Sequence, residues 1–233
     1  MKEEYKIKLS KSFLTVPIVY VVAIWIIYLI EIIFNLNFNK YGVFPRTLDG
    51  FKGVFLTHFI HSDTSHLFNN SIPLFVLLCS LFYLYKEVAY KVLLLGGLLT
   101  GFLTWIIARD SYHIGASGIV YLLFSFVFFS GIIRKHYRLV ALSLIIIFLY
   151  GSMIWYVLPI KDGMSWEGHL SGFLTGFLFA IIYRNKGMIR QEHQFQETDF
   201  DLLFDVNGNF CPPKIEESEE KQRNISEKIV KDF

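Results

Sequence analysis

The sequence predicts an all-α membrane protein whose chain crosses the lipid bilayer six times. Of its 233 residues, 54% are hydrophobic and 18% are charged, whereas a soluble domain has about 25% charged residues. The mean hydropathy of the chain is +0.46. Six apolar runs are also long enough to cross a bilayer, since a transmembrane helix needs about 20 residues.

The six runs differ in how they begin. The first follows a short basic segment, but it is long and lacks a small-residue cleavage site, so we interpret it as a spanning helix and not as a removable signal. The second and sixth open with polar residues, the fourth opens with glycines and a serine, and the fifth follows a basic cluster. The predicted spans are residues 13–34, 66–85, 88–108, 115–133, 138–158 and 165–184.

Basic residues gather in every second connection between the spans. These residues are Lys2, Lys6, Lys8 and Lys11, then Lys86 and Lys91, then Arg134, Lys135 and Arg138, and finally Arg184 and Lys186. Because cytoplasmic loops carry the excess of Lys and Arg, both chain ends are predicted to be cytoplasmic. The second, fourth and sixth spans then run from outside to inside. With no targeting presequence evident, we expect a multi-pass protein of the cell (plasma) membrane; an inner organelle membrane is the alternative.

The chain is expected to have three parts. Residues 1–12 form a cytoplasmic N-terminal segment, residues 13–185 form the six-span domain, and residues 186–233 form an acidic tail. Residues 187–233 hold 11 Asp and Glu against 6 Lys and Arg, a polar composition that predicts a largely disordered segment. The aromatic connection at residues 35–65 is either an ordinary extracellular loop or a set of short amphipathic pieces at the membrane interface.

A serine between two glycines opens the fourth span. A hydroxyl at the mouth of an apolar helix needs a polar partner in lipid. Gly115 and Gly118 remove side chains on both sides of Ser117, so its Oγ stays accessible and another group can approach it closely. The same stretch could instead serve only as a small-residue contact between helices.

The second and sixth spans also open with polar residues. His66 and Asn70 are four residues apart and share one helix face, although the asparagine could simply cap or solvate the helix start. In the sixth span, His169 shares its face with Gly172 and Gly176. Small residues there allow a neighbouring helix to come close to the histidine.

These polar groups are predicted to lie at one depth, because all three spans run from outside to inside. A serine becomes a good nucleophile when a base takes its proton, and His169 can be that base. The Asn70 amide, the His66 ring and the Ser117 backbone N–H can stabilise an oxyanion. No acidic third member is evident in the spans, so a serine–histidine dyad is the simplest arrangement.

Three stretches of the sequence resemble the motifs of the rhomboid family of intramembrane serine proteases. They are Gly115-Ala116-Ser117-Gly118, His66-Leu67-Phe68-Asn69-Asn70 and Gly168-His169-Leu170-Ser171-Gly172-Phe173. The resemblance covers about residues 10–185 and implies a rhomboid-like bundle of six transmembrane helices. It implies a nucleophile at Ser117, a base at His169 and oxyanion contacts from His66, Asn70 and the Ser117 amide.

The resemblance also implies the substrate, which is the transmembrane segment of a single-pass membrane protein, cut near its outer end. His61 resembles an additional structural histidine of the family. Many bacterial members carry a Trp-Arg pair in the first outside loop, where this chain has Phe44-Pro45-Arg46. Arg46 is a candidate for anchoring that loop at the lipid headgroups.

Other classes of intramembrane protease lack support in the sequence. A metalloprotease needs a His-Glu-x-x-His helix, which is absent. An aspartyl type needs acidic residues inside two spans, and the only acid well inside a predicted span is Glu31, close to the end of the first. No metal, organic cofactor or nucleic-acid partner is expected; the expected partners are substrate helices and the lipid bilayer. A catalytically silent relative that binds or escorts membrane helices is the main alternative, and a generic membrane scaffold is a third.

Overall fold

The computed structural model describes residues 11–135, 137–150, 155–160, 163–187, 198 and 200–211. The chain divides into two units, Met1–Arg190 and Gln191–Phe233. Within the described residues, the helices of 14 residues or more are α1 (Ser12–Ile33), α4 (Thr64–Leu84), α5 (Ala89–Ile107), α6 (Ser117–Ile133), α7 (Tyr137–Tyr150) and α8 (Trp166–Ile182). No β-strand occurs among these residues, so the helical fold class is confirmed.

Three of these helices are long and apolar enough to cross a membrane. They are α1, α4 and α5, and the apolar helix α6 follows them with 17 residues. The predicted fifth span, residues 138–158, differs from the structure: α7 is described to Tyr150, residues 151–154 lie outside the described part, and Trp155–Val157 form a 3-10 turn. The count of six spans therefore stays a prediction.

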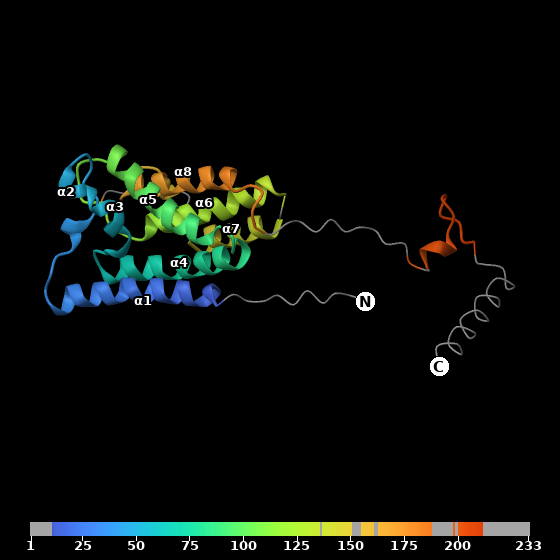
Figure 1. Cartoon of the computed structure of the whole chain (residues 1–233), viewed down its shortest axis with the longest axis horizontal. Coiled ribbons are helices and arrows are strands. Elements are labelled where there is room, and N and C mark those ends of the chain that lie inside the picture. Colours follow the sequence, from blue (N-terminus) through green and yellow to red (C-terminus); the bar gives the residue numbers. More distant parts are fainter. Residues whose placement is uncertain are drawn as a thin grey trace. The chain divides into compact units, whose positions relative to one another are not determined.

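Helix α6 forms the centre of the first unit. It contacts α4, α5, α7 and α8, and it buries residues on every side, as expected for a helix that is apolar all round. Helix α1 lies at one edge of the bundle beside α4 (Figure 1). Its outer face exposes apolar side chains such as Val19 and Ile33, which are suited to contact with lipid.

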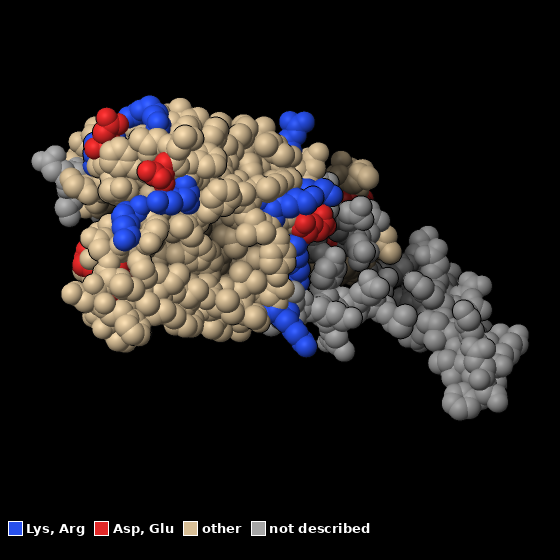
Figure 2. Space-filling view, turned by 60° about the vertical axis from the view of Figure 1, so that its left-hand side comes forward, with Lys and Arg blue, Asp and Glu red and all other residues tan. Residues whose placement is uncertain are grey.

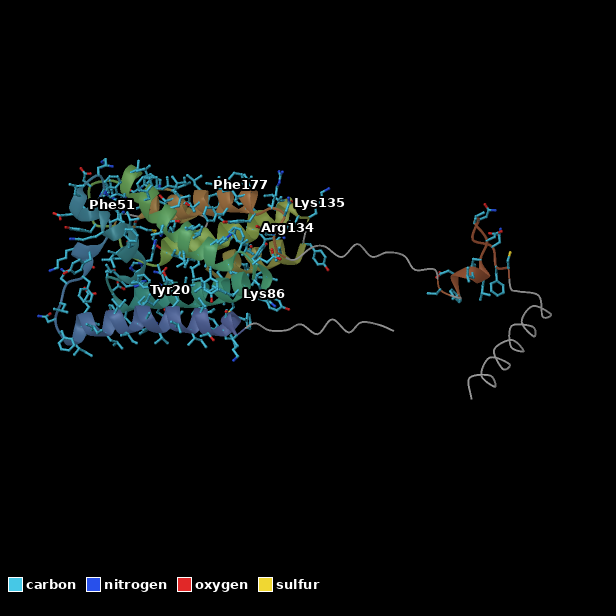
Figure 3. The ribbon with its side chains drawn as sticks, in the orientation of Figure 1. Tyr20, Phe51, Lys86, Arg134, Lys135 and Phe177 are labelled. Atoms are coloured by element: carbon cyan, nitrogen blue, oxygen red, sulfur yellow. The ribbon has the colours of Figure 1, made fainter. Side chains whose placement is uncertain are left out.

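Charged side chains gather toward the two ends of the bundle, with a wide uncharged band between them (Figure 2). Lys86, Arg134 and Lys135 come from connections that were predicted to be cytoplasmic, and they lie at the same end of the bundle (Figure 3). Phe51, from the long connection after α1, lies at the opposite end. The segregation of charge supports a chain that passes back and forth across a membrane.

The connection at residues 35–65 consists of short helical pieces. They are η1 (Asn39–Tyr41), α2 (Leu48–Phe51), α3 (Gly53–Leu56) and η2 (Thr57–Phe59). Arg46 ties this connection to the end of α5, because its Nη1 donates to the Ala108 carbonyl oxygen at 2.7 Å and its guanidinium pairs with Asp110. The predicted contact of Arg46 with lipid headgroups stays a prediction.

The described part of the second unit is a small turn. It contains η4 (Asp201–Leu203) and an isolated bridge between Phe204 and Phe210. The rest of the predicted disordered tail, residues 188–197, 199 and 212–233, lies outside the described residues, so its disorder stays a prediction.

Candidate active site

Ser117 is the first residue of α6, and the backbone before it takes an unusual turn. Gly115 has a φ of +115°, which L side chains rarely adopt. A Cβ at Gly115 would also lie 2.7 Å from Nε2 of His66. Glycine is therefore required there both by conformation and by space, and the turn leaves the Ser117 Oγ uncovered.

Two glycines bring α8 close to α6. A Cβ at Gly172 would overlap the carbonyl oxygen of Gly118, and one at Gly176 would overlap that of Leu122. The approach predicted from the small-residue face of the sixth span is thus present. It places Nε2 of His169 2.9 Å from Oγ of Ser117, which is hydrogen-bond distance.

The imidazole of His169 is held on two sides. Its Nδ1 lies 2.7 Å from the carbonyl oxygen of Tyr156. A carbonyl can only accept, so Nδ1 carries the proton and Nε2 is left to accept from the Ser117 hydroxyl. The ring of Tyr121, one turn after Ser117 on α6, stacks on the His169 ring.

His66 and Asn70 face the same serine from the start of α4. Asp63 caps this helix by accepting from the His66 backbone N–H at 2.8 Å. The His66 ring turns toward Gly115, and its Nδ1 lies 3.2 Å from Oγ of Ser62. The Asn70 side chain is 6% exposed, and its Nδ2 group has no hydrogen-bond partner among the described residues. A buried amide in this state is unusual and is suited to bind an incoming oxygen.

A cavity of about 710 Å³ joins these groups. His66, Asn70, Ser117 and His169 all line it. The sequence placed them at one depth, and the structure brings them to one cavity.

His61 supports this site from outside the spans. Its Nε2 accepts from the Ala116 backbone N–H at 3.3 Å, and its ring centroid lies 5.1 Å from that of His66. Burial lowers the pKa of His61 to about 3, so the ring is neutral and can accept this hydrogen bond. His61 thereby fixes the backbone immediately before Ser117.

Comparison with known proteins identifies the family of the chain. The family model described as Rhomboid domain matches residues 50–186, which is more than half of the chain. The chain belongs to the rhomboid family. It is 32% identical over 172 residues to Uncharacterized protein Rv1337 of Mycobacterium tuberculosis, covering 67% of this chain and 70% of that protein. Uncharacterized protein ML1171 of Mycobacterium leprae is 27% identical over 172 residues, covering 67% of each chain. The chain is thus a multi-pass membrane protein of a family of intramembrane proteases.

Several residues of this rhomboid site were not anticipated from the sequence. Tyr121 had a detectable signal, because it lies four residues after Ser117 and so shares its helix face. Arg109 and Glu167, which form an ion pair at the cavity, had a weaker signal: Arg109 directly follows the third predicted span, and Glu167 lies at the start of the sixth. The Tyr156 carbonyl had no signal in the sequence, since every residue carries a backbone carbonyl.

Proposed function

We propose that this rhomboid is an active intramembrane serine endopeptidase that cuts transmembrane segments of single-pass membrane proteins. One observation carries the proposal: the Ser117 hydroxyl donates to the free nitrogen of His169 at 2.9 Å, beside a cavity large enough for an extended peptide. A hydroxyl within reach of a correctly protonated base is the feature that distinguishes an activated serine from a structural one.

In the proposed reaction, Oγ of Ser117 bonds to the scissile carbonyl carbon while its proton passes to Nε2 of His169. The tetrahedral intermediate then loses its amine, which takes that proton from His169, and an acyl-enzyme remains. A water molecule attacks the ester, again giving its proton to His169, and the acid is released as Ser117 regains its hydrogen. The Tyr156 carbonyl stabilises the imidazolium through Nδ1–H, where a triad would use an aspartate.

The developing oxyanion needs donors on the cavity side of Ser117. The Asn70 amide is the readiest, because its Nδ2 is buried and uncommitted among the described residues. The Ser117 backbone N–H is a second, since the leading N–H groups of a helix have no acceptor within it. The His66 ring is a third donor, from Nε2, when the Ser62 hydroxyl turns to donate a hydrogen bond to its Nδ1, 3.2 Å away. In the structure that hydroxyl donates to Oδ2 of Asp63 at 2.7 Å.

The protein is proposed to cross the plasma membrane six times, with both termini in the cytoplasm. Lys86, Arg134 and Lys135 lie at the same end of the bundle, and this supports the orientation, because cytoplasmic connections carry the excess of Lys and Arg. Residues 13–185 then form the protease domain between a cytoplasmic N-terminal segment and an acidic tail. The active site lies toward the outer surface, where water reaches the cavity and the substrate is cut near its outer end.

A catalytically silent rhomboid that binds or escorts membrane helices is the alternative. It is disfavoured because Ser117, His169, His66 and Asn70 are all present and share the cavity.

The test is cleavage of a tagged single-span reporter in liposomes by the native chain and by Ser117→Ala and His169→Ala. Cleavage by the native chain alone supports the proposal. Retention of the reporter by all three proteins without cleavage, across several reporter sequences, would favour the silent relative. Cleavage that persists in both variants would show that Ser117 and His169 are not the catalytic residues.

A further inference from the structure

An ion pair lies at the edge of the cavity and joins two segments that are far apart in sequence. The Glu167 carboxylate is 2% exposed. It accepts from the Arg109 guanidinium at 3.1 and 3.2 Å and from the Arg109 backbone N–H at 3.2 Å. The second guanidinium nitrogen donates to the Met164 carbonyl oxygen at 2.6 Å. A buried carboxylate is costly unless it is paired and hydrogen-bonded, so this pairing is strongly held.

His113 adds a second link between the same two segments. Its Nε2 lies 3.0 Å from the Arg109 carbonyl oxygen and its Nδ1 lies 2.7 Å from Oγ of Ser165. The carbonyl can only accept, so Nε2 carries the proton and Nδ1 accepts from the Ser165 hydroxyl. Ser165 directly precedes α8, and Arg109 begins the connection from α5 to Ser117.

The position of these links in the chain indicates their role. Glu167 lies two residues before His169, in the first turn of α8. The tightest glycine contacts with α6, at Gly172 and Gly176, lie after His169, whereas before it a Cβ at Gly118 of α6 would stay 3.5 Å from the Gly168 carbonyl oxygen, an ordinary contact distance. Gly172 and Gly176 therefore set how close the two helices come, on the far side of His169 from the helix start. The first turn needs its own attachment, because helix ends fray unless they are tied down.

We propose that the Arg109–Glu167 pair is a positioning clasp that holds the start of α8, and with it His169, in register with Ser117. The clasp does not touch the reacting atoms; it acts through the backbone that carries the base. This inference rests on the proposed function. A displacement of about 1 Å between reacting groups can lower a rate on the order of 100-fold, so loss of the clasp lowers turnover without removing any catalytic group.

The decisive variant is the double change Arg109→Gln with Glu167→Gln. It removes the clasp without leaving a single buried charge, so the fold is preserved better than by either change alone. The matched control is Asp110→Asn, which breaks the neighbouring exposed ion pair with Arg46; within the described part of the chain, Asp110 has no hydrogen bond or ion pair to α8. Arg109→Lys keeps the charge but loses the planar fork, and it should restore part of the lost turnover.

Three readouts are compared, namely kcat and KM for the reporter, the rate of fluorophosphonate labelling of Ser117, and the Nε2 resonance of His169 in 15N-histidine-labelled protein. The double variant should lose at least tenfold in kcat and in labelling rate with KM within twofold. Its His169 resonance should move toward the value measured in Ser117→Ala. Asp110→Asn should match the native protein in all three readouts.

A native kcat and a native His169 resonance in the folded double variant would overturn the clasp. A raised KM with unchanged kcat would also overturn it, because Arg109 would then be contacting substrate. If the native chain neither cuts nor labels, the protease proposal fails, whereas the His169 resonance still decides whether the clasp positions the histidine.

Discussion

The ring of Tyr121 stacks on the ring of His169, with centroids 4.3 Å apart and planes inclined by 17°. Tyr121 lies one turn after Ser117 on α6, so one rigid helix supplies both the proposed nucleophile and the surface on which the proposed base rests. Together with the Tyr156 carbonyl, this contact leaves the imidazole little freedom to rotate away from the serine.

Replacing Tyr121 tests the role of this stacking. Tyr121→Leu should lower kcat about tenfold, because the imidazole loses a flat support and samples other orientations. Tyr121→Phe keeps the ring and should stay within about threefold of the native rate. The measurement is reporter cleavage at saturating reporter; equal rates for the Leu and Phe variants would show that the ring does not position His169.

Asn70 is expected to be the principal side-chain donor to the oxyanion. Asn70→Ala should lower kcat by about 100- to 1,000-fold with KM close to native, as for loss of one oxyanion donor. Asn69→Ala is the control, because Asn69 also lines the cavity but is exposed, and among the described residues its amide makes only a long contact of 3.5 Å with Ser65. If both alanine variants keep the native kcat, the oxyanion is stabilised elsewhere.

The helix contact at Gly172 and Gly176 should tolerate no added methyl group. At each position a Cβ would meet backbone atoms of α6, which cannot move aside as a side-chain tip can. Alanine at either position should destabilise the protein by about 1–3 kcal/mol and lower its melting temperature by several degrees. Gly97→Ala is the matched control, because its Cβ would meet the flexible tip of Ile119 at 3.0 Å. If this variant loses as much stability, overlap with the backbone is not what destabilises the variants at Gly172 and Gly176.

Acidification should destabilise the protein through the buried histidines outside the spans. Burial lowers the pKa of His58 to about 4 and that of His61 to about 3. Both folded-state values lie below the unfolded value of about 6.5, so the unfolded chain binds these protons first as the pH falls. Stability is full above pH 6.5 and declines by about 1.4 kcal/mol per histidine for each pH unit between 6.5 and the folded pKa.

The measurement is the melting temperature in detergent at pH 7.5 and pH 4.5 for the native chain and for His61→Asn. Asparagine can still accept from the Ala116 N–H, but it does not titrate. The melting temperature of the native protein should fall further between pH 7.5 and pH 4.5 than that of the variant. Equal losses would mean that His61 stays accessible to protons in the folded state.

Much of this site was predictable because its elements follow from local patterns. Composition and run length predicted a helical membrane protein, and the i, i+4 spacing of His66 and Asn70 predicted their shared face. The glycines at 172 and 176 predicted the close approach of another helix. The four polar residues were grouped into one site because of the predicted direction of their spans: polar residues at the outer ends of spans that run in the same direction lie at one depth.

The rest depended on contacts that no local pattern encodes. The carbonyl that fixes the His169 tautomer comes from Tyr156, and any residue type could have supplied it. The partner of Glu167 is Arg109, 58 residues away in the chain, and no local pattern links the two. The fifth span was predicted to end at residue 158 because residues 155–158 are apolar, but Trp155–Val157 form a 3-10 turn. Residues 151–154 lie outside the described part, so the end of this span stays a prediction.

Covalent labelling shows whether His169 activates Ser117 as a nucleophile. The purified protein is treated with a fluorophosphonate, and the modified residue is identified by mass spectrometry in the native chain, in His169→Ala and in Ser117→Ala. We expect a single adduct, on Ser117, in the native chain. Labelling of His169→Ala should be at least 100-fold slower, and Ser117→Ala should carry no adduct. An unmodified Ser117 in the folded native chain, or labelling at the native rate without His169, would contradict the activation of Ser117 by His169.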